Sequence, residues 1–328
     1  MTQPSLDVIA VGDAMVDVIA TCDDAFLAAR GLEKGGMRLL ATDEADSLYA
    51  AMGTGRETSG GSAANSMAGV AALGGRSGFI GQIANDQLGA IFAHDMQTLG
   101  VTFATPPIEG PPPTGRCLIL VTPDAQRTMN TCPGASHALT PKALDADLIR
   151  SAAITFLEGY LWGPEQPRAA MLEAARIAQA AGRTVAFTLS ESLSIGDRRR
   201  GVLGMIESGL VDMLFGNEHE VRHLTGCGEI SDCLDWFSGR VSTLVVTRGA
   251  GGAIGLDGDE RVDVAAVPVA NVVDTTGAGD LFAAGFVTAR CRGRSLRQCL
   301  EAGSSAAAEI ISHFGARPEA DLKELVSL

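Results

Sequence analysis

Short apolar runs alternate along this chain with longer stretches in which apolar residues recur at helical spacing. A short apolar run that ends at glycine or polar residues is typical of a buried strand, and a 3.6-residue period indicates a helix. The runs predict strands at residues 8–12, 78–83, 154–157, 185–189, 213–215 and 244–247. The periodic stretches predict helices at residues 63–73, 88–99, 168–181, 201–206, 278–290 and 296–312. This alternation predicts an α/β fold with a doubly wound, mostly parallel sheet flanked by helices.

Two segments, residues 16–40 and 101–131, depart from this alternation. They contain short β-like stretches such as VDVIAT and TGRCLILVT, and GPPPTG forms a rigid turn within the second segment. Neither segment has the pattern of a crossover helix, so we expect the two to meet in space as a small β-sheet lid. The predicted organisation is therefore a main α/β domain of residues 1–15, 41–100 and 132–328, with a discontinuous lid of residues 16–40 and 101–131.

Composition narrows the class of protein. The 328 residues include 39 acidic and 25 basic side chains, a net charge of −14, which would repel nucleic-acid phosphates. No apolar run approaches the roughly 20 residues that cross a bilayer. Seven irregularly spaced cysteines and an N-terminus without a leader pattern favour reduced thiols. We expect a soluble, cytoplasmic protein that binds neither nucleic acid nor membranes.

The first glycine-rich stretch is SGGSAANSMAGVAALGG at residues 59–75. Gly60 and Gly61 precede a predicted helix, where a missing Cβ lets a ligand approach the backbone. Ser62 is a suitable N-cap, and the Asn65 amide lies in the first turn, within reach of a ligand above the helix. An ordinary glycine-rich helix entry with tight packing explains this stretch equally well.

The second glycine-rich stretch is DTTGAGDLFAAGF at residues 274–286. Gly277, Ala278 and Gly279 open a helix, and the free N–H groups of a helix start attract anions such as phosphate. Asp280 in the same turn could accept a proton from a substrate hydroxyl. An N-capping aspartate on a structural helix would explain Asp280, but it would not require the preceding Gly-Ala-Gly.

Together, in this order and about two hundred residues apart, the two stretches resemble the signatures of the ribokinase family. This family is also called the phosphofructokinase-B-type carbohydrate and nucleoside kinases, and the likeness extends along nearly the whole chain. The resemblance implies a doubly wound nucleotide- and substrate-binding domain with a β-sheet lid. It also implies transfer of the ATP γ-phosphate to a sugar or nucleoside hydroxyl, with Asp280 as catalytic base and Gly277 to Gly279 as anion hole.

A competing motif is HEVRH at residues 219–223, which fits the H-E-x-x-H pattern of zinc metalloproteases. The extended protease motif needs a histidine where Glu229 stands. The surrounding FGNEHE instead resembles the kinase family's N-x-x-E motif. That resemblance implies that Asn217 and Glu220 position Mg²⁺ and phosphate through water, without a direct protein ligand to the metal. A metalloprotease remains the remote alternative.

The stretch TLVVTRGAGGAIG at residues 243–255 resembles the family's nucleotide-binding segment. The resemblance places Thr247 and Gly249 near the ATP phosphates and lets Gly252 approach the nucleotide closely, although an ordinary β-turn also explains Gly252. It further implies a monovalent cation, K⁺, near Asp274, and a homodimer formed through paired lids.

The acceptor side is predicted from VGDAMVD, in which Asp13 and Asp17 follow the first strand. Carboxylates there could accept hydrogen bonds from sugar hydroxyls, and the resemblance adds Gly61 and Asn65 to that site. A simple turn residue explains Asp13 as well. Arg127 on the lid is expected to contact the phosphate or the acceptor. The alternative interpretation is that Arg127 is an ordinary surface residue of the lid.

The stretches LEKGGMRL, TGRC, RTMNT, EGYLW and IISHFGARP look more like adenosine kinases than ribokinases or fructokinases. Tyr160, Leu161 or Trp162 would then supply apolar surface against a purine. Asp13 departs from this subtype, which usually has asparagine there. The sequence thus favours phosphorylation of a nucleoside, adenosine first, at its 5′-hydroxyl, with a sugar such as ribose, fructose or ketodeoxygluconate as the alternative acceptor.

Overall fold

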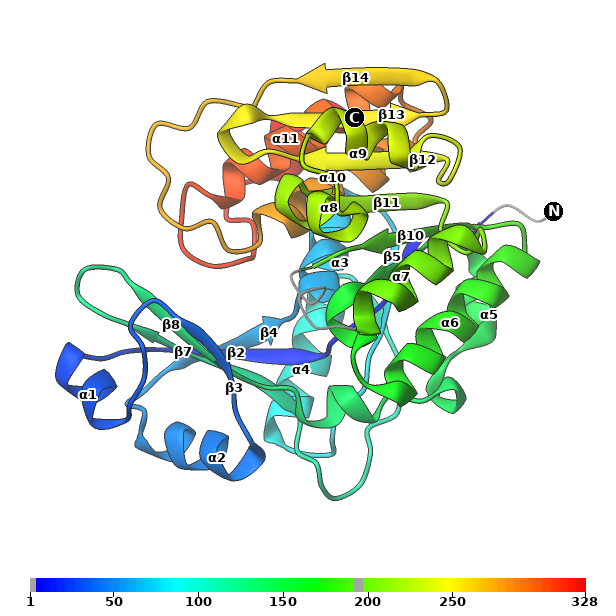
Figure 1. Cartoon of the computed structure of the whole chain (residues 1–328). Helices are drawn as coiled ribbons and strands as arrows, with labels where there is room; N and C mark the ends of the chain where they lie inside the picture. The colour runs from blue at the N-terminus through cyan, green and yellow to red at the C-terminus, as the bar shows by residue number, and fades with distance from the viewer. Residues whose placement is uncertain (1–3, 191–196) are drawn as a thin grey trace.

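The computed structural model describes residues 4–190 and 197–328, and the larger of its two sheets has nine strands within these residues. Their order is β14-β13-β12-β11-β10-β9-β1-β5-β6 (Figure 1). From β6 to β12 all neighbours are parallel, and β13 and β14 add antiparallel pairs at one edge. The bounds are β1 Leu6–Val11, β5 Ser77–Ile80, β6 Thr102–Phe103, β9 Ala152–Glu158, β10 Thr184–Thr188, β11 Met213–Asn217, β12 Thr243–Thr247, β13 Ala253–Asp257 and β14 Glu260–Val264. The predicted α/β class is confirmed.

Helices cover both faces of this sheet. Successive strand residues point to opposite sides, so an apolar strand has two apolar faces that must be buried. In β1, Val8 and Ala10 join one apolar core, and Ile9 and Val11 join the other. The first core is closed by α3 Ser62–Ala72, α10 Ala278–Cys291 and α11 Leu296–Ile310, with α4 Gln87–Thr98 towards β4 and β6. The second core is closed by α5 Ala146–Ser151, α6 Glu165–Ala180, α7 Asp197–Glu207, α8 Glu218–Thr225 and α9 Ile230–Phe237.

A second sheet of five strands in the order β3-β8-β7-β2-β4 projects from the main domain at the lower left of Figure 1. Its strands are β2 Met15–Thr21, β3 Met37–Leu39, β4 Arg56–Gly60, β7 Gly115–Val121 and β8 Arg127–Cys132, with α1 Asp24–Ala29 and α2 Thr42–Ala51 nearby. Two predicted boundaries differ from the observed sheets. β4 lies within residues 41–100 yet belongs to the small sheet, and β6 lies within residues 101–131 yet pairs with β5. The polar sequence RETSG carries no strand pattern, so only its pairing with β2 identifies β4.

The chain passes between the two sheets twice at the same place. Gly12, Asp13 and Ala14 join β1 to β2, and Gly61 joins β4 directly to α3. These crossings bring the first predicted acceptor residues to the N-terminal end of α3. The remaining short elements are the 3₁₀ turns η1 Gly134–Ala138, η2 Pro141–Ala143, η3 Gly159–Trp162 and η5 Gly249–Gly251, and the helix α12 Leu322–Leu325.

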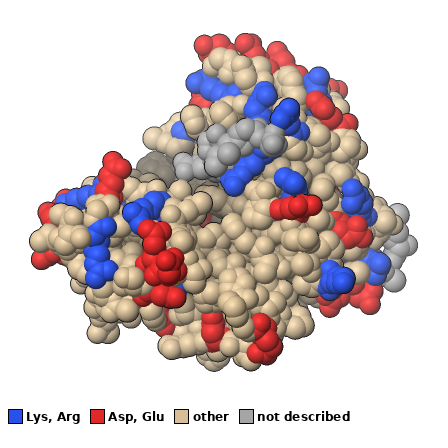
Figure 2. All heavy atoms as spheres, turned by 60° about the horizontal axis from the view of Figure 1, so that its bottom comes forward, with Lys and Arg blue, Asp and Glu red and all other residues tan. Residues whose placement is uncertain are grey.

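The surface drawn in Figure 2 carries basic and acidic side chains of the described residues interspersed among uncharged ones. Among the helices in the described part of the chain, none has the length and apolar character that a bilayer crossing requires.

Candidate active site

The start of α10 has the backbone geometry that the glycines predicted. Gly277 is the N-cap with φ 79°, a left-handed conformation, and a Cβ there would lie 2.8 Å from the Ala316 Cβ. A Cβ on Gly279, by contrast, would meet no atom within 4 Å, so space is open above the first turn. The Ala278 N–H donates to the Thr275 carbonyl at 3.2 Å. Ala278 would have to give up this bond to serve as an anion-hole donor.

Asp280 faces the start of α3. The Ser62 hydroxyl donates to Asp280 Oδ1 at 2.6 Å, and the Asn65 amide donates to Oδ2 at 2.9 Å. Burial raises the pKa of Asp280, and these two hydrogen bonds and the charge of Arg317 oppose that rise. Ser62 is thus not the N-cap that its sequence position predicted. Gly61, with φ 94°, takes the N-cap position and leaves the Ser62 hydroxyl directed at Asp280.

A cavity of about 260 Å³ lies in front of this pair of helix starts. Its lining brings together residues from six segments of the chain: Ser62, Tyr160, Thr188, Ser190, Phe215, Gly216, Asn217, Glu220, Val245, Thr247, Gly279, Asp280 and Phe282. A larger hollow of about 780 Å³ lies beside residues 104–108 and 140–150, but the predicted chemical groups do not line it. The smaller cavity thus brings together the predicted base and nucleotide-side residues, whereas the predicted acceptor residues Asp13, Asp17, Gly60, Gly61 and Asn65 are not in its lining.

Asp17 on β2 lies against Gly60 of β4. A Cβ on Gly60 would come within 2.5 Å of the Asp17 carboxylate, so a side chain there would displace that carboxylate. Burial raises the pKa of Asp17 to about 6, although the charges of Arg317 and Arg127 oppose the rise. Asp17 therefore lies close enough to Arg317, Arg127 and Asp280 for their charges to act on it.

Asp13 belongs to a buried acidic pair that the sequence did not reveal. Its backbone N–H donates to Glu158 Oε1, and Glu158 Oε2 accepts from the Ala63 N–H at 2.7 Å. Glu158 is fully buried, and this burial, with Asp13 beside it, raises its pKa well above the usual range. Burial also raises the pKa of Asp13, which the nearby His137 opposes. Asp13 Oδ1 is buried without a hydrogen-bond partner among the described residues.

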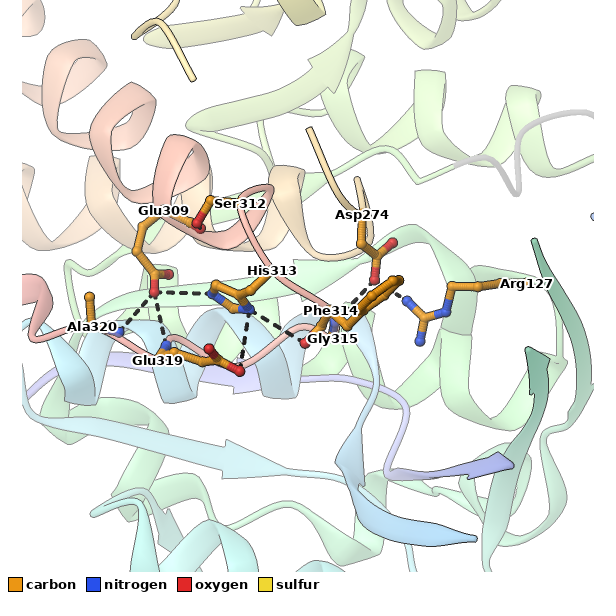
Figure 3. A network of polar contacts seen from close by, with 9 residues as sticks. All are labelled: Arg127, Asp274, Glu309, Ser312, His313, Phe314, Gly315, Glu319 and Ala320. Carbon is orange, nitrogen blue, oxygen red and sulfur yellow. Dashed lines mark hydrogen bonds and ion pairs between the residues drawn. The ribbon is translucent and has the colours of Figure 1, made fainter. Parts of the chain in front are cut away.

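Arg127 of β8 contacts the loop before α10 (Figure 3). It is paired with Asp274 and donates to Thr276 Oγ1 at 3.0 Å. Asp274 also accepts from the Thr276 N–H and, at 3.0 Å, from the Gly315 N–H. These donors lower the pKa of Asp274 although burial acts in the opposite direction. Protein donors therefore engage both carboxylate oxygens of Asp274.

The 3₁₀ turn after β9 separates the three residues predicted to contact a base. Tyr160 lines the cavity and is partly exposed. Leu161 is fully buried in the second core, and Trp162 packs edge-on against Phe187 with ring centroids 5.9 Å apart. The prediction for Leu161 is therefore wrong, because the turn directs it into the core and directs only Tyr160 to the cavity.

Asn217 and Glu220 form a reciprocal cap at the start of α8. Asn217 Oδ1 accepts from the Glu220 N–H, and Glu220 Oε2 accepts from the Asn217 N–H, both at 2.8 Å. Both residues also line the cavity. The cavity also contains Asp280, and two carboxylates without further charged protein ligands among the described lining residues fit Mg²⁺ held largely through water. Within the described residues there is no group of three or more His, Cys, Asp or Glu side chains that could hold a metal directly.

The predicted nucleotide residues lie at the end of β12. Thr247 lines the cavity, and a Cβ on Gly249 would meet no atom within 4 Å. Gly252 has φ 81°, and a Cβ there would lie 2.0 Å from the Val264 carbonyl oxygen. The close packing of β14 thus suffices to explain Gly252.

Arg317 is a site residue that the sequence reasoning missed. It donates to the Ser59 carbonyl at 2.8 Å and to Asn65 Oδ1, and so reaches both β4 and α3 from the C-terminal segment. The stretch IISHFGARP contains it, but nothing in local spacing indicates that this arginine would fold back onto Asn65. The sequence reasoning also missed Glu158, because its hydrogen-bond partners are more than ninety residues away in the chain.

The match to known proteins agrees with this geometry. The model of the pfkB family of carbohydrate kinases matches residues 5–322. The chain belongs to this family. As a pfkB kinase it is a phosphotransferase acting on the hydroxyl group of a sugar or nucleoside. The family and fold predicted from the two glycine-rich stretches are confirmed.

Two solved structures resemble this kinase along nearly its whole length. A probable sugar kinase from Rhizobium etli CFN 42 is 42% identical with a TM-score of 0.90, covering 98% of both chains. An adenosine kinase from Sinorhizobium meliloti is 44% identical with a TM-score of 0.89, covering 97% of this chain and 98% of the other. A ribokinase from Arabidopsis thaliana is 27% identical over 84% of this kinase and 73% of its own length.

Family membership also decides the interpretation of HEVRH. In this kinase, Asn217 and Glu220 cap α8 and line the cavity, and His219 and His223 belong to the same helix. The metalloprotease interpretation is wrong.

Proposed function

We propose that this protein is an ATP-dependent kinase that phosphorylates the 5′-hydroxyl of a nucleoside, with adenosine as the first candidate. The observation that carries the proposal is the position of Asp280, which lines the cavity beside the open space above Gly279 and is held by Ser62 and Asn65. Phosphoryl transfer requires a base within reach of the acceptor hydroxyl and free space for the phosphoryl group, and Asp280 and the space above Gly279 offer both.

In the proposed reaction, Asp280 takes the proton from the acceptor hydroxyl as that oxygen attacks the γ-phosphorus. Its raised pKa makes it a stronger base than an exposed carboxylate. The first-turn N–H groups of α10 stabilise charge on the transferred phosphoryl group, because helix starts leave such donors without an intrahelical partner, and Ala278 joins them when it gives up its bond to Thr275. Magnesium, positioned through water near Glu220, would neutralise phosphate charge. The lid excludes competing water from the cavity.

For the acceptor, Asp13 and Asp17 offer carboxylate oxygens next to Gly60 and Gly61. The buried, unpartnered Asp13 Oδ1 is suited to a hydroxyl donor, since a buried acceptor without a partner is costly. Tyr160 presents an aromatic ring at the cavity, where a purine could pack. The similarity to the Sinorhizobium meliloti adenosine kinase supports a nucleoside, and the similarity to the Rhizobium etli probable sugar kinase keeps a sugar as the alternative.

On the nucleotide side, Thr247 and Gly249 would border the ATP phosphates, with Gly252 behind them. A putative ribokinase II from E. coli with the same fold was solved with ATP and Mg²⁺, which supports these two cofactors here. Arg127 would act at the lid, close to where the phosphoryl group passes. K⁺ near Asp274 stays a prediction.

We further propose a homodimer through the lids and a cytoplasmic location. All three residues of the edge strand β3 are exposed, including Met37 and Leu39 at 55% and 68%, and such edges favour pairing. The seven cysteines are free, which suits a reducing compartment supplied with ATP.

The test is an ADP-release screen with adenosine, other nucleosides, ribose, fructose and ketodeoxygluconate, run with K⁺ and with Na⁺ as the only monovalent cation. We expect kcat/KM to be highest for adenosine. A sugar that exceeds every nucleoside would replace the acceptor and leave the kinase assignment in place.

The matched variant is Asp280→Asn, which keeps the hydrogen-bonding shape and removes the base. We expect kcat to fall by a factor of about 10³ or more, with a much smaller change in acceptor affinity. Wild-type turnover by this variant, with its fold verified by circular dichroism, would remove Asp280 from the mechanism.

A further inference from the structure

The C-terminal segment after α11 returns across the start of α10 and is fixed at several points (Figure 3). The Gly315 N–H donates to Asp274 Oδ2 at 3.0 Å. The N–H groups of Glu319 and Ala320 both donate to Glu309 Oε1 at 2.9 Å. Between these anchors, Ala316 packs against Gly277, and Arg317 follows it. The backbone at Arg317 is therefore held on both sides.

The Arg317 guanidinium bridges two elements of the acceptor site. Its Nη2 donates to the Ser59 carbonyl at 2.8 Å and to Ser59 Oγ at 3.0 Å, and its Nη1 donates to Asn65 Oδ1. Ser59 lies at the end of β4 and Asn65 lies on the first turn of α3. One side chain thus fixes the distance between lid strand and helix.

This contact also decides which way the Asn65 amide points. A guanidinium only donates hydrogen bonds, so Asn65 must present its oxygen to Arg317. The Asn65 NH₂ group then faces Asp280 and donates to Oδ2 at 2.9 Å. An ionised carboxylate only accepts, so the reversed amide would place oxygen against oxygen at Asp280.

The charges around this contact are mostly acidic. Asp17 on β2, Asp95 on α4 and Asp280 on α10 interact with Arg317. Glu158 on β9 faces Asp280, and Arg127 on β8 faces Asp17. The positive charge of Arg317 favours the ionised forms of both Asp17 and Asp280.

We infer that Arg317 is a positioning residue for the phosphoryl transfer: it ties the end of β4 to the first turn of α3 and orients the Asn65 amide towards Asp280. This inference rests on the proposed role of Asp280 as base. Arg317 acts on the base through Asn65 and through its charge.

The experiment compares Arg317→Gln and Arg317→Lys with the wild type across a pH series of kcat and kcat/KM. Glutamine removes the charge and the fork, and we expect kcat to fall by about 100-fold, as small misplacements of reacting groups do. Losing a nearby positive charge raises carboxylate pKa values, so the acidic limb should move up by about one pH unit. Lysine keeps the charge, so kcat should fall while the limb stays near its wild-type position. The KM for ATP should hardly change.

Arg292→Gln is the matched control, because Arg292 also donates to a main-chain carbonyl, that of Leu73 at 2.8 Å, away from the cavity. Its pH profile should equal that of the wild type. A glutamine variant with an unmoved acidic limb and a wild-type kcat overturns the inference. If Arg317→Gln does not fold, the Arg317→Lys variant tests the inference instead. An unchanged kcat in Arg317→Lys would then overturn the positioning role of Arg317.

The outcome is separable from the proposed function. If Asp280→Asn is inactive but the Arg317 variants behave as wild type, only the positioning role fails. If Asp280→Asn is active, the proposed mechanism itself fails.

Discussion

At the residue scale, the site is a cluster of acids balanced by two arginines. Asp17, Asp280 and Glu158 come from three different elements, and burial raises the pKa of each. Arg127 and Arg317 reach the cluster from the lid and from the C-terminal segment and oppose that effect at Asp17. A chain with net charge −14 thus places two arginines among the buried acids of the site.

Asp17 gives this balance a measurable consequence for stability. Its pKa of about 6 in the folded protein exceeds the value of 3.8 expected when it is unfolded. Between these values the folded state binds more protons, so its contribution to stability is present at about pH 4 and is lost as pH rises through 6. The unfolding free energy of the wild type should therefore fall by about 2 to 3 kcal/mol between pH 4 and pH 7 because of Asp17. We predict that Asp17→Asn abolishes this fall and raises the acceptor KM.

Urea unfolding of the wild type and the variant at several pH values between 4 and 7 measures the Asp17 effect. Their difference in unfolding free energy should change between about pH 4 and 6 and change little between about pH 6.5 and 7. A difference that stays constant over this range would contradict the raised pKa.

At the element scale, the start of α10 uses its glycines in two different ways. Gly277 needs glycine for its left-handed φ and for the close packing of Ala316. Gly279 is helical and faces open space, so its missing side chain is not required by packing. The same three-residue motif therefore combines a structural glycine with one whose space is available to a ligand.

Alanine substitution should separate these two uses. We predict that Gly277→Ala destabilises the protein by about 1 to 3 kcal/mol, because φ and packing both oppose a Cβ. Gly279→Ala should leave stability equal or up to about 1 kcal/mol higher, since alanine favours helix, while kcat/KM falls at least about tenfold. Urea titrations and ADP-release kinetics measure both effects. Full activity in Gly279→Ala would show that the space above the turn is not used in transfer.

At the scale of the whole molecule, the lid is joined to the main domain by contacts that lie far apart in sequence. Arg127 on β8 reaches Asp274, and the apolar core of the main sheet continues into the lid through residues such as Val16 and Leu118. The outer edge of the lid, β3, remains exposed over its whole length.

This edge predicts concentration-dependent pairing of the lids. We expect the wild type to sediment as a dimer and Leu39→Glu to sediment as a monomer, because a charge at the edge opposes strand pairing. Leu325→Glu, at a similarly exposed leucine near the C-terminus, serves as the control and should remain dimeric. A monomeric wild type at all concentrations would contradict the lid dimer.

The sequence by itself determined the α/β class, the small sheet, and the helix start with Gly277, Gly279 and Asp280. These features depend on hydrophobic period and on local backbone requirements, which neighbouring residues encode. The same local reasoning misassigned Ser62 as a cap and Leu161 as a base contact, since the direction of each side chain depends on the exact backbone path of a short turn, at Gly61 and in η3.

Only the tertiary structure decided which distant groups meet Asp280. The partners Asn65 and Arg317 are separated by more than two hundred residues, and the pairing of β4 with β2 brings Ser59 and Asp17 beside them. Periodicity carries no information about such contacts, because they form only when segments that are distant in the sequence pack against one another. The acidic cluster and its arginines are therefore a property of the folded chain.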